Sequence, residues 1–159
     1  MQQRRVWRLC REPDASALTG DSACRDGSRW SSPGRPVACL STERGCAVLE
    51  ILVHVERMQP PGEYHVVDVS IDDALWESAS NVTPEQLPPD WREPGNAACR
   101  AIGDAWLNQP DHPALLMVPS AVVPGVTNVL FDPLHVDAAQ VSIAAIEPFV
   151  FDARLFDRA

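Results

Sequence analysis

One carboxylate stands out in this sequence because of its neighbours. Glu50 lies between two apolar triplets, residues 47–49 and 51–53, in a stretch whose pattern predicts a helix. A helix that is apolar on most of its circumference is largely buried, and a buried carboxylate is costly unless it is paired or hydrogen-bonded. Glu50 is therefore a candidate functional group.

The same spacing allows a structural interpretation. Helical periodicity places Glu50 on one stripe with Glu43, Cys46, His54 and Arg57. Glu50 and His54 would then form an ordinary i, i+4 pair on a solvated face. The residues alone leave both interpretations open.

Three arginines lie in a polar, glycine-containing loop that spans residues 20–36: Arg25, Arg29 and Arg35. A guanidinium group binds phosphate through two parallel N–H donors, so this loop could hold a phosphate group. Solvated loop charges are the commoner cause of such a cluster. The loop by itself establishes no function.

Other nucleophiles and metal ligands carry weaker signals. Ser120 lacks the flanking glycines of a hydrolase nucleophile elbow, which excludes an acyl-enzyme mechanism. His135 has no second ligand near it in the sequence and is interpreted as structural. The cysteines are odd in number and show no C-x-x-C spacing, which argues against a zinc cage or a disulfide framework, so reduced thiols and no metal are expected. They are Cys10, Cys24, Cys39, Cys46 and Cys99.

The elements that must position these residues follow from periodicity and turn signals. A helix is predicted from a cap at Ser41 or Thr42 towards Met58, and a second over residues 96–108 with Asn96 as its cap. Residues 72–94 read as a surface excursion with at most one short helix. Strands are predicted at 6–10, 37–41, 63–71, 115–118, 126–131 and 142–151. This succession predicts an α+β fold, with mixed or antiparallel sheets and flanking helices in one domain over residues 1–159.

Composition narrows the function classes. The chain has 159 residues, 45% of them apolar, which suffices for one hydrophobic core. A formal charge of -9 and a pI near 4.7 argue against direct binding to nucleic acid or to an anionic membrane surface. The amino terminus has no apolar run typical of a signal peptide, and no segment approaches the roughly 20 apolar residues of a transmembrane helix. A soluble, cytoplasmic protein is expected.

Four stretches together resemble a known family. They are GSRWSSPGRPVACLSTERGCAVLEILVH at 27–54, GDAWL at 103–107, VPSAVVPGVTNVLFDPLHVD at 118–137 and FVFDARLF at 149–156. In order and spacing they resemble the RES domain family, the toxin components of bacterial toxin–antitoxin pairs whose antitoxins are similar to Xre-type helix-turn-helix regulators. The resemblance covers nearly the whole chain.

The resemblance implies a fold similar to that of the ADP-ribosyltransferase toxins and a cleft that binds NAD as a substrate. Members of the family break the bond between nicotinamide and ribose by hydrolysis or phosphorolysis, or transfer ADP-ribose to a protein. The implied partner is an Xre-like antitoxin, and a homodimer is an arrangement that the sequence leaves open. The chain has no G-x-G-x-x-G stretch, so a Rossmann-type NAD site is not expected.

The resemblance also implies roles for individual residues. Glu50 would stabilise the oxocarbenium-like ribose, and Arg29 would hold the diphosphate, with Arg35 or Arg57 as a second arginine. Ser120 would hydrogen-bond the nicotinamide amide or the ribose, and Asn128 would form the same wall.

One position departs from the family pattern. Cys39 stands where the family has a tyrosine, and together with Ser41 it would line the cofactor site. A thiol offers neither the stacking face nor the hydroxyl of a phenol. Either Trp30 or Tyr64 covers the cofactor instead, or activity is weakened. Two function classes follow: an NAD-consuming toxin, and a catalytically weakened domain that survives as an antitoxin-binding module.

Overall fold

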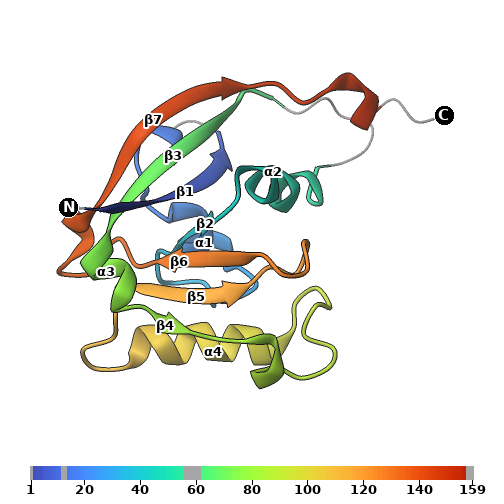
Figure 1. Ribbon diagram of the computed structural model, residues 1–159. Coiled ribbons are helices and arrows are strands. Elements are labelled where there is room, and N and C mark those ends of the chain that lie inside the picture. Colours follow the sequence, from blue (N-terminus) through green and yellow to red (C-terminus); the bar gives the residue numbers. More distant parts are fainter. Residues whose placement is uncertain (1, 12–13, 56–61, 157–159) are drawn as a thin grey trace.

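The computed structural model describes residues 2–11, 14–55 and 62–156. Seven strands form one twisted sheet, with helices packed against it (Figure 1). The strands are β1 Gln3–Cys10, β2 Ala38–Ser41, β3 Tyr64–Asp72, β4 Ser80–Asn81, β5 Leu115–Pro119, β6 Thr127–Phe131 and β7 Val141–Phe149. The helices are α1 Asp21–Asp26, α2 Arg44–Leu52, α3 Asp73–Glu77 and α4 Ala97–Asn108.

The strands are ordered β4-β5-β6-β2-β1-β3-β7 across the sheet. All neighbours pair antiparallel except β4 and β5, which are parallel. The sheet is therefore mixed, and the predicted α+β class is confirmed. Each predicted strand forms, with limits that differ by a few residues.

The strand register places four residues in a row across the sheet. Trp7 of β1 pairs with Ser41 of β2, Ser41 pairs with Asn128 of β6, and Asn128 pairs with Val118 of β5. Directly opposed residues point to the same face. Ser41 and Asn128 therefore project from one face side by side, where β2 ends and β6 begins.

The two faces of the sheet carry different cores. On one face, alternate residues such as Val67, Val129 and Phe131 belong to the largest apolar cluster. The opposite face carries two clusters. One includes Leu130 and lies where α4 covers β5 and β6. The other includes Leu9 and lies where α2 packs near β1. The row that contains Ser41 and Asn128 lies between these two helices.

Local sequence explains α4. The Asn96 side chain accepts hydrogen bonds from the backbone N–H groups of Ala98 and Cys99, which confirms the predicted cap. The helix buries Cys99, Gly103, Trp106 and Leu107, whose spacing follows one face of a helix.

The structure corrects three expectations about local elements. The predicted polar loop contains α1, six residues long. The N-cap of α2 is Glu43, not Ser41 or Thr42, because Ser41 is still paired in β2. The excursion after β3 contains α3, the short strand β4 and a 3-10 turn at Pro84–Gln86, which is more structure than predicted.

The helix predicted to run towards Met58 ends earlier, at Leu52. Met58, towards which this helix was predicted to run, lies outside the described residues. Within the described ranges, no helix combines the length and apolar character needed to cross a membrane.

Candidate active site around Glu50

Glu50 is hydrogen-bonded by two side chains that come from distant parts of the sequence. Its Oε1 atom accepts from Ser120 Oγ at 2.6 Å and from Asn128 Nδ2 at 2.8 Å. Ser120 is 1% exposed and Asn128 3% exposed, whereas Glu50 is half-buried. The carboxylate is thus held from the protein interior and reaches towards the surface.

The sheet and α2 create this meeting point. Asn128 stands in the row across the sheet, and Ser120 follows directly after β5, the strand beside β6. Helix α2 contacts β1 and β2 and carries Glu50 over the end of this row. The alternative pairing of Glu50 with His54 is absent among the described contacts, and α2 is only partly buried, with Leu49 40% exposed.

The hydroxyl of Ser120 has a fixed direction. Its Oγ accepts hydrogen bonds from the backbone N–H groups of Val122 and Val123 at 3.1 and 3.0 Å. A hydroxyl has two acceptor lone pairs and one hydrogen, so that hydrogen is left to donate to Glu50. Ser120 therefore orients the carboxylate, whereas the resemblance implied a contact with nicotinamide or ribose.

The two oxygens of Glu50 differ in their surroundings. Within residues 2–11, 14–55 and 62–156, Oε1 receives both short hydrogen bonds and Oε2 takes part in no hydrogen bond or ion pair. The group is a carboxylate with one anchored oxygen and one available oxygen. Such a group can stabilise positive charge that develops on a bound molecule.

A residue that the sequence did not suggest also contacts this cluster. Cys46, one helical turn before Glu50, is 3% exposed, and its sulfur lies 3.5 Å from Ser120 Oγ. Its place on the stripe with Glu50 was visible from helical spacing. Its contact with Ser120 depends on the tertiary fold.

Ser41 and Cys39 lie on the same face of β2. Ser41 is buried beside Asn128, and its Oγ accepts from the N–H of Glu43 at 3.3 Å. Cys39 is half-buried and packs against the cluster beneath α4. Burial, and secondly the negative charge of Glu50, raise the pKa of the Cys39 thiol to about 12, so the thiol is neutral at physiological pH.

Arg29 makes its contacts elsewhere. Its Nη1 donates to the carbonyl oxygens of Trp91 and Glu93 at 2.9 and 3.2 Å, and its Nη2 donates to that of Arg92 at 3.2 Å. Among the described residues, no contact joins Arg29 to Glu50. Three of the five guanidinium N–H donors go to these carbonyl oxygens, and the guanidinium also interacts with the thiol of Cys99.

Helix α4 holds the loop that carries Arg29. A Cβ atom at Gly103 would overlap the carbonyl oxygen of Trp30, so only glycine permits this close approach. One residue later, the carboxylate of Asp104 accepts from both the N–H and the hydroxyl of Ser32. Two residues of the GDAWL stretch thus position the arginine loop.

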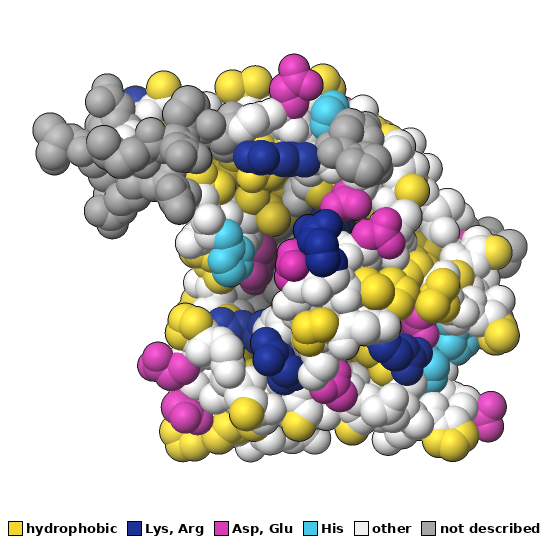
Figure 2. Space-filling model, turned by 180° about the vertical axis from the view of Figure 1, so that it is seen from behind, with side chains coloured by type: hydrophobic (Ala, Val, Ile, Leu, Met, Phe, Trp, Pro, Cys, Tyr) yellow, Lys and Arg dark blue, Asp and Glu magenta, His cyan; other side chains and the backbone are white. Residues whose placement is uncertain are grey.

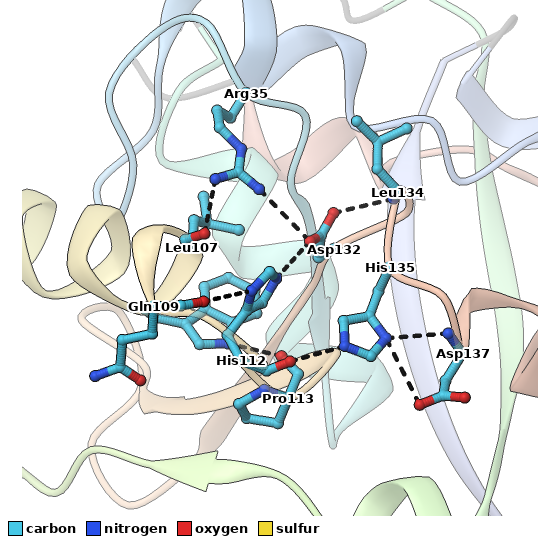
Figure 3. A network of polar contacts seen from close by, with 10 residues as sticks. Arg35, Leu107, Gln109, His112, Pro113, Asp132, Leu134, His135 and Asp137 are labelled. Atoms are coloured by element: carbon cyan, nitrogen blue, oxygen red, sulfur yellow. Dashed lines mark hydrogen bonds and ion pairs between the residues drawn. The ribbon is translucent and has the colours of Figure 1, made fainter.

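Asp132 is the centre of a second polar cluster (Figure 3). Its buried carboxylate accepts from the N–H of Leu134 at 3.0 Å and lies 2.7 Å from His112 Nε2 and 3.7 Å from Arg35. Arg35 also donates to the carbonyl oxygen of Leu107 at 2.7 Å. Arg35 is therefore committed to this cluster, and Arg57, the other expected second arginine, lies outside the described residues.

His135 joins the same cluster through hydrogen bonds to backbone groups. Its Nε2 donates to the carbonyl oxygen of His112 at 2.7 Å, and its Nδ1 accepts from the N–H of Asp137 at 3.0 Å. Both ring nitrogens are satisfied, which supports the structural interpretation of this histidine. Within the described ranges, no group of three or more His, Cys, Asp or Glu side chains is arranged for a metal ion.

The surface near α2 is concave. In Figure 1, α2 lies above the connection between β5 and β6 at the right of the molecule. Figure 2, turned by 180°, shows the surface hollowed on the corresponding left side, with basic, acidic and histidine side chains around it. The hollow thus lies on the side of the molecule where Figure 1 shows α2 and the connection between β5 and β6.

A family model and several known proteins are similar to this chain over most of its length. The model of the RES domain family matches residues 5–152. The chain is 32% identical to a Sphingobium protein named Prs ADP-ribosylating toxin, over 96% of this chain and 97% of that protein. It is 34% identical to Toxin Res of Pseudomonas putida, over 95% of this chain and 99% of that protein, and 33% identical to Toxin Res of Yersinia enterocolitica, over 89% and 91%.

A solved structure shares the fold. The chain superposes on a chain of the M. tuberculosis MbcT–MbcA toxin–antitoxin complex with a TM-score of 0.67, covering 94% of this chain and 85% of the other. Sequence identity over this match is 16%, so it establishes similarity of fold.

Proposed function

Because this chain belongs to the RES domain family of toxins, we propose that it consumes NAD by breaking the bond between nicotinamide and ribose. The observation that carries the proposal is the anchored carboxylate of Glu50, with Oε1 held by Ser120 and Asn128 and Oε2 available. The Sphingobium relative is named as an ADP-ribosylating toxin, which supports NAD as the substrate.

Cleavage of the bond between nicotinamide and ribose is favoured by a carboxylate placed in this way. As nicotinamide departs, the ribose C1′ acquires oxocarbenium character, and a nearby negative charge lowers the energy of that state. Oε2 of Glu50 is the oxygen that would face the ribose, either at the ring or at a hydroxyl. Because Ser120 and Asn128 already fix Oε1, the carboxylate would need little rearrangement as the charge develops.

Arg29 is proposed to hold the diphosphate of NAD. Three of its five N–H donors bind backbone carbonyls among the described residues, and a two-point contact with phosphate oxygens needs two donors. Trp30 follows it in the same loop and packs against Trp91, with 6.2 Å between ring centroids. Cys39, Ser41 and Asn128 would line the other side of the cofactor.

Water or phosphate is the proposed acceptor of the ADP-ribose. Attack by water yields nicotinamide, ADP-ribose and a proton, whereas attack by a phosphate oxygen yields nicotinamide and ADP-ribose carrying a phosphate at C1′. A protein side chain is the second candidate acceptor, favoured by the name of the Sphingobium relative.

One experiment separates the acceptors. Purified protein is incubated with NAD, with and without phosphate, and the products are identified by mass spectrometry. Free ADP-ribose indicates hydrolysis, a phosphorylated product that appears only with phosphate indicates phosphorolysis, and a mass increase on proteins of an added lysate indicates transfer. Intact NAD under all three conditions would contradict the proposal and favour the antitoxin-binding module.

The proposed partner is an Xre-like helix-turn-helix antitoxin, and the proposed location is the cytoplasm, where NAD is available. The similar fold in M. tuberculosis was solved as a toxin–antitoxin complex, which supports a partner of this kind. Co-expression with the product of the neighbouring gene, followed by purification of the tagged toxin, tests it. Light scattering of the isolated toxin distinguishes a monomer from a homodimer.

A further inference from the structure

Cys46 contacts both of the side chains that, among the described residues, hydrogen-bond to the Glu50 carboxylate. Its sulfur lies 3.5 Å from Ser120 Oγ, 3.9 Å from Asn128 Oδ1 and 4.0 Å from Glu50 Oε1. These separations are within the range of sulfur hydrogen bonds. The thiol has one hydrogen, so it can serve as donor to one of these three atoms at a time.

Counting donors and acceptors indicates where that hydrogen goes. Ser120 Oγ already accepts from two backbone N–H groups, and Glu50 Oε1 already accepts two short bonds. For Asn128 Oδ1, the thiol of Cys46 is the hydrogen-bond donor found among the described residues. The amide oxygen of Asn128 is therefore the acceptor that needs this hydrogen.

We propose that Cys46 is a positioning residue of the active site, whose thiol holds the Asn128 amide in the orientation that turns its NH₂ group towards Glu50. The proposal deepens the function proposed above and rests on it for its kinetic consequence. In the resulting chain, Cys46 donates to the Asn128 carbonyl, the Asn128 amide donates to Oε1, and Ser120 donates to the same oxygen. Oε2 thus remains the oxygen available to substrate.

A purely packing role and a positioning role make different predictions for two variants. Cys46→Val fills the volume of the sulfur without a donor, and Cys46→Ser keeps a donor on a shorter bond. If Cys46 only filled space, Cys46→Val would retain kcat better than Cys46→Ser. The positioning role predicts the reverse order, with about a threefold to tenfold lower kcat in Cys46→Val and little change in KM, since a thiol is a weak donor. Cys24→Ser, in α1, has no described contact with the Glu50 cluster and is the matched control with expected unchanged kcat.

A double-mutant cycle tests whether Cys46 acts through Asn128. Asn128→Ala alone should lower kcat, because the donor from Asn128 to Glu50 is lost. Adding Cys46→Val to that variant should cause little further loss, because the group that Cys46 orients is gone. Additive losses, or a Cys46→Val enzyme as active as the wild type, would overturn the proposal.

A measurement without NAD tests the positioning role of Cys46 separately from the proposed cleavage of NAD. The side-chain NH₂ signals of Asn128, assigned by their loss in Asn128→Ala, are recorded by ¹⁵N NMR in the wild type and the Cys46 variants. Faster hydrogen exchange of these signals in Cys46→Val than in Cys46→Ser supports the positioning role, and identical spectra and exchange rates refute it. If the wild type leaves NAD intact while the NMR difference appears, the proposed function fails and the role of Cys46 stands.

Discussion

Gly103 of α4 and Trp30 of the arginine loop touch backbone to backbone, so closely that the carbonyl oxygen of Trp30 occupies the space of a Cβ atom. The contact fixes the residue that follows Arg29 directly onto a helix. The position of the proposed phosphate-binding arginine therefore depends on a glycine more than 70 residues away in sequence.

Gly103→Ala should destabilise the protein by about 1–3 kcal/mol, because the new methyl group forces the loop away from α4. Urea denaturation of both proteins measures the difference. Gly45→Ala is the matched control: Gly45 lies in α2, its Cβ would meet no atom within 4 Å, and the change should stabilise by about 0.5–1 kcal/mol. Equal stability of the Gly103 variant and the wild type would show that the loop can move away from α4 without loss of stability.

Glu50→Gln should reduce nicotinamide release by about 10²- to 10³-fold while the fold stays intact. Glutamine keeps an oxygen that Ser120 and Asn128 can bind, but it has no negative charge for the ribose cation. Release is followed by chromatography, and circular dichroism monitors the fold. Glu43→Gln, at the exposed N-cap of the same helix, is the control and should retain wild-type turnover. Unchanged turnover in a folded Glu50→Gln protein would falsify the assignment.

Arg29→Lys should weaken both NAD binding and the fold. Lysine keeps the charge, but it cannot reproduce three bonds to the carbonyls of residues 91–93 together with a two-point phosphate contact. Calorimetry measures the NAD affinity and thermal unfolding measures the stability. Arg25→Lys, in the same loop region and exposed, should change neither quantity. Lower stability with unchanged NAD affinity would assign Arg29 a structural role alone.

Cys39→Tyr should raise NAD affinity and lower the melting temperature. Cys39 packs against the cluster beneath α4, so a larger side chain costs about 1–3 kcal/mol of packing energy there. Because the position is only half-buried, part of the ring can reach the proposed cofactor, where stacking and a hydroxyl contact contribute on the order of 1–2 kcal/mol. Both quantities are measured on one preparation. Lower affinity at an unchanged melting temperature would show that the family role of this position does not apply here.

Alkaline pH should destabilise the fold through Cys39. Its folded-state pKa of about 12 lies above the ordinary value of 9.0, so the fold favours the neutral thiol. The contribution of this thiol to the free energy of unfolding is fully present below pH 9 and is lost as the pH rises from 9 towards 12. The reason is that the thiol can release its proton in the unfolded chain but not in the folded one. The chain has no lysine, which removes one class of side chain that titrates in this window. Melting temperatures between pH 8 and 11 should fall less steeply for Cys39→Ala than for the wild type; parallel curves would contradict this prediction. Part of the fall in melting temperature with pH should remain in Cys39→Ala, because burial also raises the pKa of Cys99.

Local signals predicted the elements, but not their neighbours in the sheet. Asn96 and the buried face of α4 mark that helix within 13 residues of sequence, and alternation marks β3. Helix α1 was missed because its six residues, DSACRD, carry little apolar periodicity. The pairing of β2 with β6 joins segments separated by more than 80 residues, and no local pattern encodes it.

The site residues also fall into those that local sequence indicates and those that depend on the tertiary fold. Glu50 could be singled out because a lone carboxylate among apolar residues is locally visible, and Ser120 and Asn128 were grouped with it through the family resemblance. The carbonyl contacts of Arg29 depend on the path of residues 91–93, and the contacts of Cys46 with Ser120 and Asn128 span 74 and 82 residues. Neither follows from spacing along the chain.

The distance along the chain between Glu50 and its hydrogen-bond donors matters during biosynthesis. Translation proceeds from the amino terminus, so α2 leaves the ribosome long before Ser120 and Asn128 are made. Until β6 pairs with β2, the nascent chain has the carboxylate but neither donor that anchors it. A chain interrupted before residue 128 therefore cannot assemble the cluster that anchors this carboxylate.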